Sequence, residues 1–336
     1  VEMLDRAAEL LPDQWPVLYA EGTGLLWEND RFDEAQQRFI TLLRKHPDYD
    51  DARRGLATLL NLRGFRFDAN QQIRFLSRRP RFQATIDELR GLMVPSRSYH
   101  AFESKPPTDD REWIKSTGEL NVARALYGEG DVRDALSVLQ QSDVLRQGHP
   151  AALALYGRIV LESQQFELFE QWLRDVVASP ERRAQCERYP AYWLAMGGWA
   201  LRQQDPRQAM RFFAEALVRE PGEVPAHDRM LQALEAAGET DAAQRFDQRR
   251  IQVRGLVKLT GLLVESPEIG PEAYMELAGL LEQVGRPFEA KNWRSLARMR
   301  MGQGADAMRQ ADMELADLLA SENPAEARAT LLCGLD

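Results

Sequence analysis

The stretch that decides the fold is AYWLAMGGWALRQQDPRQAMRFFAEALVREP, residues 191–221. It consists of a helix-forming segment, a polar break, a second helix-forming segment and a closing proline. The stretch WPVLYAEGTGLLWENDRFDEAQQRFITLLRKHP, residues 15–47, has the same organisation. Self-similarity of this kind predicts a repeat architecture, in which each hairpin of helices packs only against its neighbours.

Units with this organisation align along the chain, starting at residues 16, 50, 116, 150, 190, 224 and 271, and several successive starts lie 34 residues apart. The eighth position of a unit is small at Thr23, Ala57, Ala123, Gly157, Gly197 and Ala278, and Leu231 is the exception. The twentieth position is alanine at Ala35, Ala69, Ala135, Ala209, Ala243 and Ala290, and Phe169 is the exception. Two helices that cross closely need a very small side chain where their axes meet, so these positions predict the crossing points.

This pattern resembles the tetratricopeptide repeat, which has a large residue at position 4, a small one at 8, alanine at 20, an aromatic residue at 24 and proline at 32 of each unit. Trp193, Phe39 and Phe213 are predicted to fill the space beside the crossings. The resemblance implies an all-α, right-handed α-solenoid of about seven to eight helix-turn-helix units, with irregular insertions. Left-handed turns are expected where the first helices end, at Gly64, Gly130, Gly238 and Gly285.

The composition is that of a folded, helical protein. Of the 336 residues, 44% are hydrophobic and 28% are charged, and Leu and Ala together number 85 against 23 for Ile and Val. Leu and Ala favour helix, whereas the β-branched residues favour strand. The sequence contains no run of 18 apolar residues, so no membrane span is expected.

Breaks in the period divide the chain into three parts. Residues 1–83 are predicted to form N-terminal repeats with an incomplete first unit, because AAELLP at residues 7–12 matches only the end of a second helix. Residues 84–115 are predicted to form an irregular helix and a proline-rich loop, and the 94–111 loop is a candidate for partner contact. Residues 116–336 are predicted to form C-terminal repeats, with a lengthened second helix near 258–270 and a truncated last unit from residue 308.

The charge balance points to protein partners. The formal net charge is −9, and nucleic-acid binding depends on clustered Lys and Arg that neutralise phosphates, so no nucleic-acid partner is expected. A protein or peptide is the expected partner. Exposed apolar ends of an array also predict self-association.

No catalytic residue, metal site or cofactor is expected. The sequence lacks GxxxxGK[ST], HExxH and GxSxG motifs, and its four histidines, which stand in or beside turns, are predicted to be solvated or to cap helices: His46, His100, His149 and His227. Cys186 and Cys333 are too few and too far apart for a disulfide framework and are predicted to be small buried side chains.

The resemblance implies that positions 2, 5, 6, 9, 12 and 13 of each first helix face a concave groove. Carried onto this sequence, it yields these candidate partner-binding residues: Trp27, Arg54, Asn61, Asn121, Arg124, Tyr127, Arg158 and Glu162. A guanidinium beside an amide suits a peptide backbone or a carboxylate. In the alternative interpretation, Arg158 and Glu162 only pair with each other on a solvated face. The Lys and Asn set with which some family members clamp a terminal carboxylate is missing.

These observations favour a non-enzymatic scaffold that binds a peptide or a partner domain in the groove. The first alternative is a regulatory or substrate-recruiting segment of a larger multidomain bacterial protein or enzyme. The second is a small-ligand-binding helical sensor domain, which an enclosed cavity ringed by Arg and Trp would support.

Overall fold

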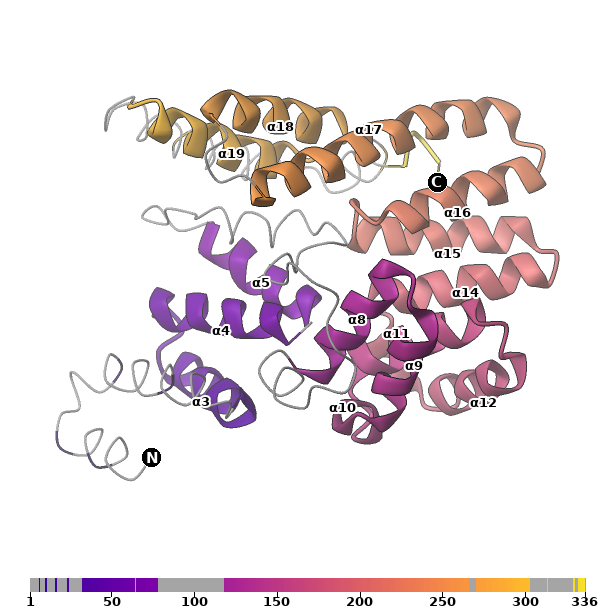
Figure 1. Ribbon diagram of the computed structural model, residues 1–336, viewed down its shortest axis with the longest axis horizontal. Helices are drawn as coiled ribbons and strands as arrows, with labels where there is room; N and C mark the ends of the chain where they lie inside the picture. Colours follow the sequence, from indigo (N-terminus) through magenta and orange to yellow (C-terminus); the bar gives the residue numbers. More distant parts are fainter. Residues whose placement is uncertain are drawn as a thin grey trace. The chain divides into compact units, whose positions relative to one another are not determined.

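The computed structural model describes residues 32–63, 65–77, 118–265, 270–302 and 332–335, and the single residues at 6, 10, 16, 23, 313 and 329. All regular secondary structure in this part of the chain is helical, and the predicted all-α solenoid is confirmed. The chain forms two compact units, one made of Val1–Gln83 and Pro106–Val122 and the other of Ala84–Lys105 and Ala123–Asp336. Figure 1 shows the helices of both units.

The described part of the first unit contains a complete helical hairpin. α4 (Asp50–Leu62) and α5 (Arg66–Ser77) pack against each other, and α3 (Phe32–Lys45) packs against α4. α3 is the second helix of the unit predicted to start at residue 16. Its ring at Phe39 lies so close to α4 that a Cβ added to Gly55 would be 2.6 Å from it. The absence of a side chain at Gly55 therefore lets α3 and α4 approach.

The second unit repeats the hairpin along the chain. α11 packs on α14, and from α14 to α19 each helix packs on the next one in sequence. In Figure 1, α14, α15, α16 and α17 lie side by side. α8 (Glu119–Glu129) begins in the first unit and continues in the second from residue 123. The other described helices of the second unit are α9 (Val132–Gln141), α10 (Asp143–Arg146), α11 (Pro150–Glu162), α12 (Phe166–Val177), α13 (Pro180–Cys186), α14 (Pro190–Arg202), α15 (Pro206–Arg219), α16 (Val224–Ala236), α17 (Thr240–Glu265), α18 (Pro271–Gln283) and α19 (Pro287–Arg300).

The helix starts agree with the predicted unit starts. First helices begin at Asp50, Pro150, Pro190, Val224 and Pro271, which are the predicted first residues of their units. Proline is favoured in the first turn of a helix because its missing N–H would have no partner there and its fixed φ suits the helix. The unit predicted to start at residue 116 begins its helix three residues later, at Glu119.

The predicted crossing points are confirmed at Gly157 and Gly197. An added Cβ would lie 2.4 Å from the Trp172 ring at Gly157 and 2.3 Å from the Phe213 ring at Gly197. The alanine at position 20 of the same unit, Ala209, has no exposed surface. A larger residue at Gly197 would displace Phe213 and cost roughly 1–3 kcal/mol through overpacking.

In the hairpins whose turn the structure describes, a left-handed residue stands at position 15 of the unit. Gly64, predicted for the same role, lies outside the described residues. Gly130, Gly238 and Gly285 take positive φ angles there, as predicted. In two other units the same position carries glutamine, Gln164 and Gln204, each with a φ of 59°. A side chain makes this conformation unfavourable, so the backbone of these two hairpins is strained.

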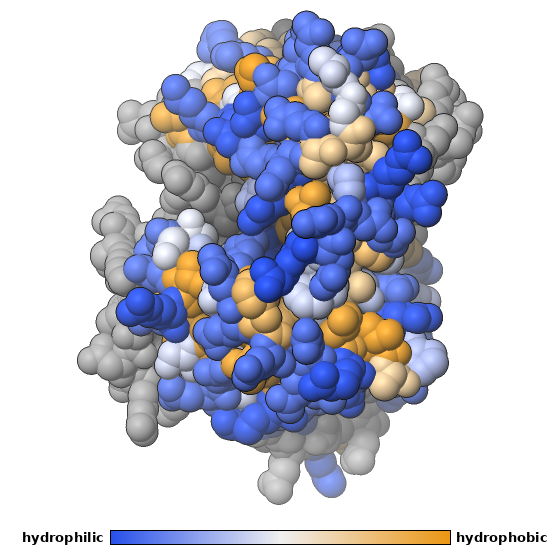
Figure 2. Space-filling model, turned by 90° about the vertical axis from the view of Figure 1, so that its right-hand side faces the viewer, coloured by the Kyte–Doolittle hydropathy of each residue, from blue (hydrophilic) through white to orange (hydrophobic). Residues whose placement is uncertain are grey.

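The lengthened second helix predicted before residue 270 is also confirmed, because α17 spans 26 residues. The incomplete first unit, the insertion at 84–115 and most of the unit from 308 lie outside the described residues. Figure 2 shows one face of the molecule, on which hydrophilic side chains predominate and hydrophobic ones form small separate patches.

Candidate functional site

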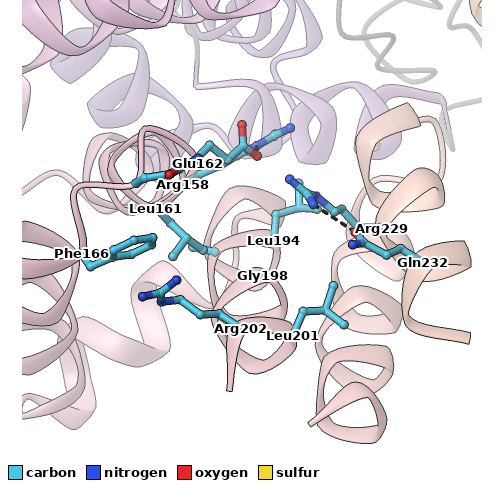
Figure 3. A pocket seen from close by; sticks show the side chains of 12 residues that line it. Arg158, Leu161, Glu162, Phe166, Leu194, Gly198, Leu201, Arg202, Arg229 and Gln232 are labelled. Carbon is cyan, nitrogen blue, oxygen red and sulfur yellow. Dashed lines mark hydrogen bonds and ion pairs between the residues drawn. The ribbon is translucent and has the colours of Figure 1, made fainter. Parts of the chain in front are cut away.

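A pocket of about 500 Å³ lies in the second unit between α11, α14 and α16. We refer to it as the α11–α14–α16 pocket; Figure 3 shows it from close by. It is lined by Arg158, Leu161, Glu162, Gln164, Phe166, Leu194, Ala195, Gly198, Leu201, Arg202, Arg229 and Gln232.

Most of this lining comes from equivalent positions of three successive first helices. α14 contributes residues at positions 5, 6, 9, 12 and 13 of its unit, from Leu194 to Arg202. α11 contributes positions 9, 12 and 13, and α16 contributes positions 6 and 9. Residues three and four apart share one face of a helix, so the repeat brings the same face of each first helix to the pocket. These are the positions that the family resemblance assigns to the groove.

The floor of the pocket is apolar. Leu161 and Leu194 are 8% and 5% exposed, and Phe166 contributes an aromatic ring from α12. A Cβ at Gly198 would lie 2.9 Å from the Cδ2 atom of Leu161. The missing side chain at Gly198 therefore keeps the floor open between the leucines.

A polar network adjoins the pocket and contributes Arg158 and Glu162 to its lining. The Nη1 atom of Arg158 donates to the Glu223 carboxylate at 2.9 Å, and its Nε donates to Glu162 at 3.4 Å. The Tyr127 hydroxyl donates to the same Glu162 carboxylate, and the Arg158 guanidinium lies 4.9 Å from the centre of the Tyr127 ring. The network joins α8, α11 and the start of α16, so one arginine ties three repeats together.

The charges in this network stabilise each other. Burial of the guanidinium favours its neutral form, but the electrostatic interactions with Tyr127 and with the carboxylates of Glu223 and Glu162 outweigh burial and place the pKa of Arg158 above its ordinary value. Burial is the main cause that raises the pKa of Tyr127, and Glu162 raises it further, while Arg158 acts in the opposite direction. The phenol therefore stays protonated and serves as a hydrogen-bond donor.

Two other arginines of the pocket are not neutralised. Arg202 lies with its guanidinium carbon 3.5 Å from the centre of the Phe166 ring, and Arg229 donates to the side-chain oxygen of Gln232 at 3.0 Å. Within the described residues, neither guanidinium has a carboxylate within ion-pair distance. In Figure 3, Arg202 extends beside Phe166, and Arg229 reaches over Leu194 from the side of α16.

The structure brings three of the predicted partner-binding residues together and separates the others. Tyr127, Arg158 and Glu162 meet in the network. Arg54 and Asn61 lie on α4 in the other unit, and the side chain of Asn61 is outside the described set, as is the whole of Trp27.

Asn121 and Arg124 lie on α8, where Asn121 is 1% exposed and Arg124 is half-buried. Burial at Asn121 limits what a partner could reach. The alternative interpretation of Arg158 is wrong in one respect: the pair with Glu162 exists, but the Arg158 side chain is only 8% exposed and the face is not solvated there. The binding role of all these residues stays a prediction.

Sequence reasoning missed the part of the pocket on α14 and α16. Arg202, Arg229 and Gln232 stand at groove positions 13, 6 and 9 of their units, so the same carry-over would have found them. The sequence contains no pattern that predicts Glu223 as the partner of Arg158. The two stand 65 residues apart, and only the packing of three repeats brings them together.

The prediction for the histidines is right for His149 and wrong for His227. His149 caps α11 by accepting from the backbone N–H of Ala151. His227 has no exposed surface; its Nε2 atom lies 2.9 Å from the Pro221 carbonyl oxygen, and its ring stacks on Phe246. It occupies position 4 of its unit, where the repeat places a large inward-facing side chain. Burial lowers the pKa of His227 to about 4.

The two cysteines are free, as expected from their separation. Cys186 is buried, and burial raises the pKa of its thiol to about 11. Cys333 is half-buried, so the prediction of two buried side chains holds only for Cys186.

In the described part of the chain, no group of three or more His, Cys, Asp or Glu side chains is arranged to hold a metal ion. Over the same residues, none of the helices combines the length and the apolarity needed to cross a membrane.

The comparisons with known proteins bear on the same region. No curated protein matches the sequence. Residues 146–246 match the family model described as tetratricopeptide repeat. All the residues that line the α11–α14–α16 pocket fall within this range. The predicted resemblance is therefore confirmed, and over residues 146–246 the chain is similar to tetratricopeptide-repeat proteins.

Proposed function

We propose that the chain is a non-enzymatic scaffold that holds a segment of a partner protein in the α11–α14–α16 pocket. Tetratricopeptide repeats generally mediate protein–protein interaction. The observation that carries the proposal is the composition of the lining: equivalent faces of three first helices combine an apolar floor with two arginines that have no carboxylate partner among the described residues. Interfaces of this kind bind through an apolar centre and a polar rim.

The network around Arg158 ties three repeats together and is a poor target for testing the proposal. Removing one member of a buried ion pair leaves an uncompensated charge and typically costs about 3–5 kcal/mol of folding stability. An Arg158 variant would therefore lose binding simply because the repeats come apart. Gly198 is a better target, since a side chain there enters the pocket and its close neighbour is the flexible end of Leu161.

The test is a selection of random dodecapeptides, displayed on phage at the N-terminal side of the coat protein, on the immobilised chain. Enriched peptides are then synthesised and titrated against the wild type, Gly198→Met and Gly255→Met. Gly255 also stands inside a helix, α17, and nothing lies within 4 Å of an added Cβ there. Gly198→Met is expected to weaken binding roughly tenfold or more, because a filled pocket excludes the peptide, and Gly255→Met is expected to leave it unchanged.

Enriched peptides that bind Gly198→Met as tightly as the wild type would contradict the proposal, and so would a selection that enriches none. The alternative of a recruiting segment in a larger enzyme uses the same pocket and passes the same test. The pocket volume lies in the range of small-molecule sites, but the lining contains no tryptophan, so the small-ligand alternative is only partly supported. The small-ligand alternative predicts that Gly198→Met does not weaken the binding of any peptide.

A further inference from the structure

We propose that the α11–α14–α16 pocket selects an internal protein segment in which acidic side chains stand on both sides of an apolar one. The acidic side chains would pair with Arg202 and Arg229, and the apolar one would enter the pocket above the leucine floor. This inference rests on the proposed function and specifies the chemistry of the partner.

Arg202 is held in place without being neutralised. It stands in the last turn of α14, is exposed, and packs its guanidinium on the Phe166 ring at 3.5 Å. The acid next to it in the chain is Asp205, whose Oδ1 atom accepts from the backbone N–H of Gln208 at 2.9 Å and caps α15. A cation that stacks on a ring keeps its edge N–H groups available for a carboxylate.

Arg229, on α16, likewise has no ion-pair partner among the described residues. Its Nη1 atom donates to the neutral side chain of Gln232. The neighbouring acid, Asp228, accepts from Arg250 at 3.2 Å and from Arg254 at 2.8 Å, both on α17. The carboxylate that stands closest in sequence is therefore committed to the adjacent helix and leaves Arg229 without an ionic partner among the described residues.

The third arginine of the lining does not add to this charge. Arg158 is buried between Glu162 and Glu223, which carry two negative charges against its one. Adding Arg202 and Arg229 gives three positive and two negative charges, so these five side chains carry a net charge of +1, whereas the chain as a whole carries −9. A locally positive pocket on an acidic protein attracts carboxylates and repels basic segments.

The arrangement of the two arginines favours side-chain carboxylates over a chain end. A C-terminus supplies one α-carboxylate, whereas Arg202 and Arg229 reach the pocket from different helices and offer two separate sites. Arginine binds a carboxylate with two parallel hydrogen bonds, which fixes the position as well as the charge of the acid. The same lining contains Leu161, Leu194 and Leu201, against which an apolar side chain loses contact with water.

The experiment repeats the phage selection on three proteins: the wild type, Arg202→Glu/Arg229→Glu, and Arg207→Glu/Arg211→Glu. The last two carry the same change in net charge. Arg207 and Arg211 are exposed on α15 and do not line the pocket, which makes them matched controls. Circular dichroism melting of each protein checks that it is folded, and Arg202→Gln/Arg229→Gln removes the charge without reversing it.

Peptides enriched on the wild type and on the α15 control are expected to carry acidic residues on both sides of an apolar one. Synthetic versions should bind roughly tenfold or more weakly to the Gln variant, since each lost charged hydrogen bond is costly, and their affinity should fall as salt rises. The Glu variant should enrich basic peptides instead.

Different results would contradict the proposed function and the acidic-segment inference. Enriched peptides that Gly198→Met excludes but that show no excess of Asp and Glu would overturn the acidic-segment inference and leave the proposed function standing. Acidic peptides that bind the Gln variant as well as the wild type would also overturn it. Peptides that bind Gly198→Met as tightly as the wild type would contradict the proposed function and the inference together.

Discussion

At the scale of single residues, buried polar groups in this chain stabilise the contacts between repeats. Arg158 links three repeats through Tyr127, Glu162 and Glu223, and His227 fills a core position beside Phe246. The sequence predicted Arg158 and Glu162 as groove residues from the repeat register, but it could not predict Glu223, because the contact depends on how hairpins stack. A turn beside His227 suggests a solvated side chain, but its position in the unit, the fourth, points inward and decides its burial.

The burial of His227 predicts a loss of stability in mild acid. The unfolded histidine takes up a proton near pH 6.5, whereas the folded one stays neutral until about pH 4. Between these values the unfolded chain binds more protons, so stability that is fully present above pH 6.5 falls as the pH is lowered. When the pH is lowered from about 7 to about 4.5, the free energy of unfolding of His227→Leu should therefore fall by roughly 2 kcal/mol less than that of the wild type.

Urea unfolding of both proteins at the two pH values measures this difference, and acidic groups elsewhere in the chain contribute equally to both. Equal losses in the wild type and in His227→Leu would show that His227 is protonated in the folded state as readily as in the unfolded one.

At the scale of the helical hairpin, the repeat register accounts for most of what the sequence predicted. Prolines, polar breaks and small residues at fixed positions located the first helices at Asp50, Pro150, Pro190 and Pro271 without knowledge of the structure. What the register did not reveal is that two turns adopt the left-handed conformation with glutamine. Tertiary packing of the two helices imposes the turn, and the local sequence only makes it more or less favourable.

Gln204 provides a test of this strain. Gln204→Gly should stabilise the chain by roughly 0.5–1 kcal/mol, because glycine adopts a positive φ without a steric penalty and only part of the gain is lost to its flexibility when unfolded. The matched control is Gln203→Gly, since Gln203 precedes it in the same turn with a φ of −78° and should lose stability on substitution. Urea unfolding compares the variants, and a loss of stability in both would refute the strain.

At the scale of the whole molecule, repetition explains both the fold and the pocket. Because each unit presents the same face of its first helix, positions that are unremarkable in one helix form a continuous lining when three units stack. The sequence predicted that such a lining exists and which positions form it. It did not show which units enclose a pocket, because that depends on side chains of neighbouring repeats, such as the absence of one at Gly198 and the mutual neutralisation of Arg158 and Glu223.

The most direct test of the central claim is photo-crosslinking of an enriched acidic peptide to the chain. A photoreactive phenylalanine analogue replaces either Gln232, an exposed residue of the pocket lining, or Gln244, an exposed glutamine on α17 outside it. After irradiation, mass spectrometry identifies the adducts. The account predicts an adduct at position 232 that excess unlabelled peptide abolishes, and none at 244; an adduct at 244 with none at 232 would contradict it.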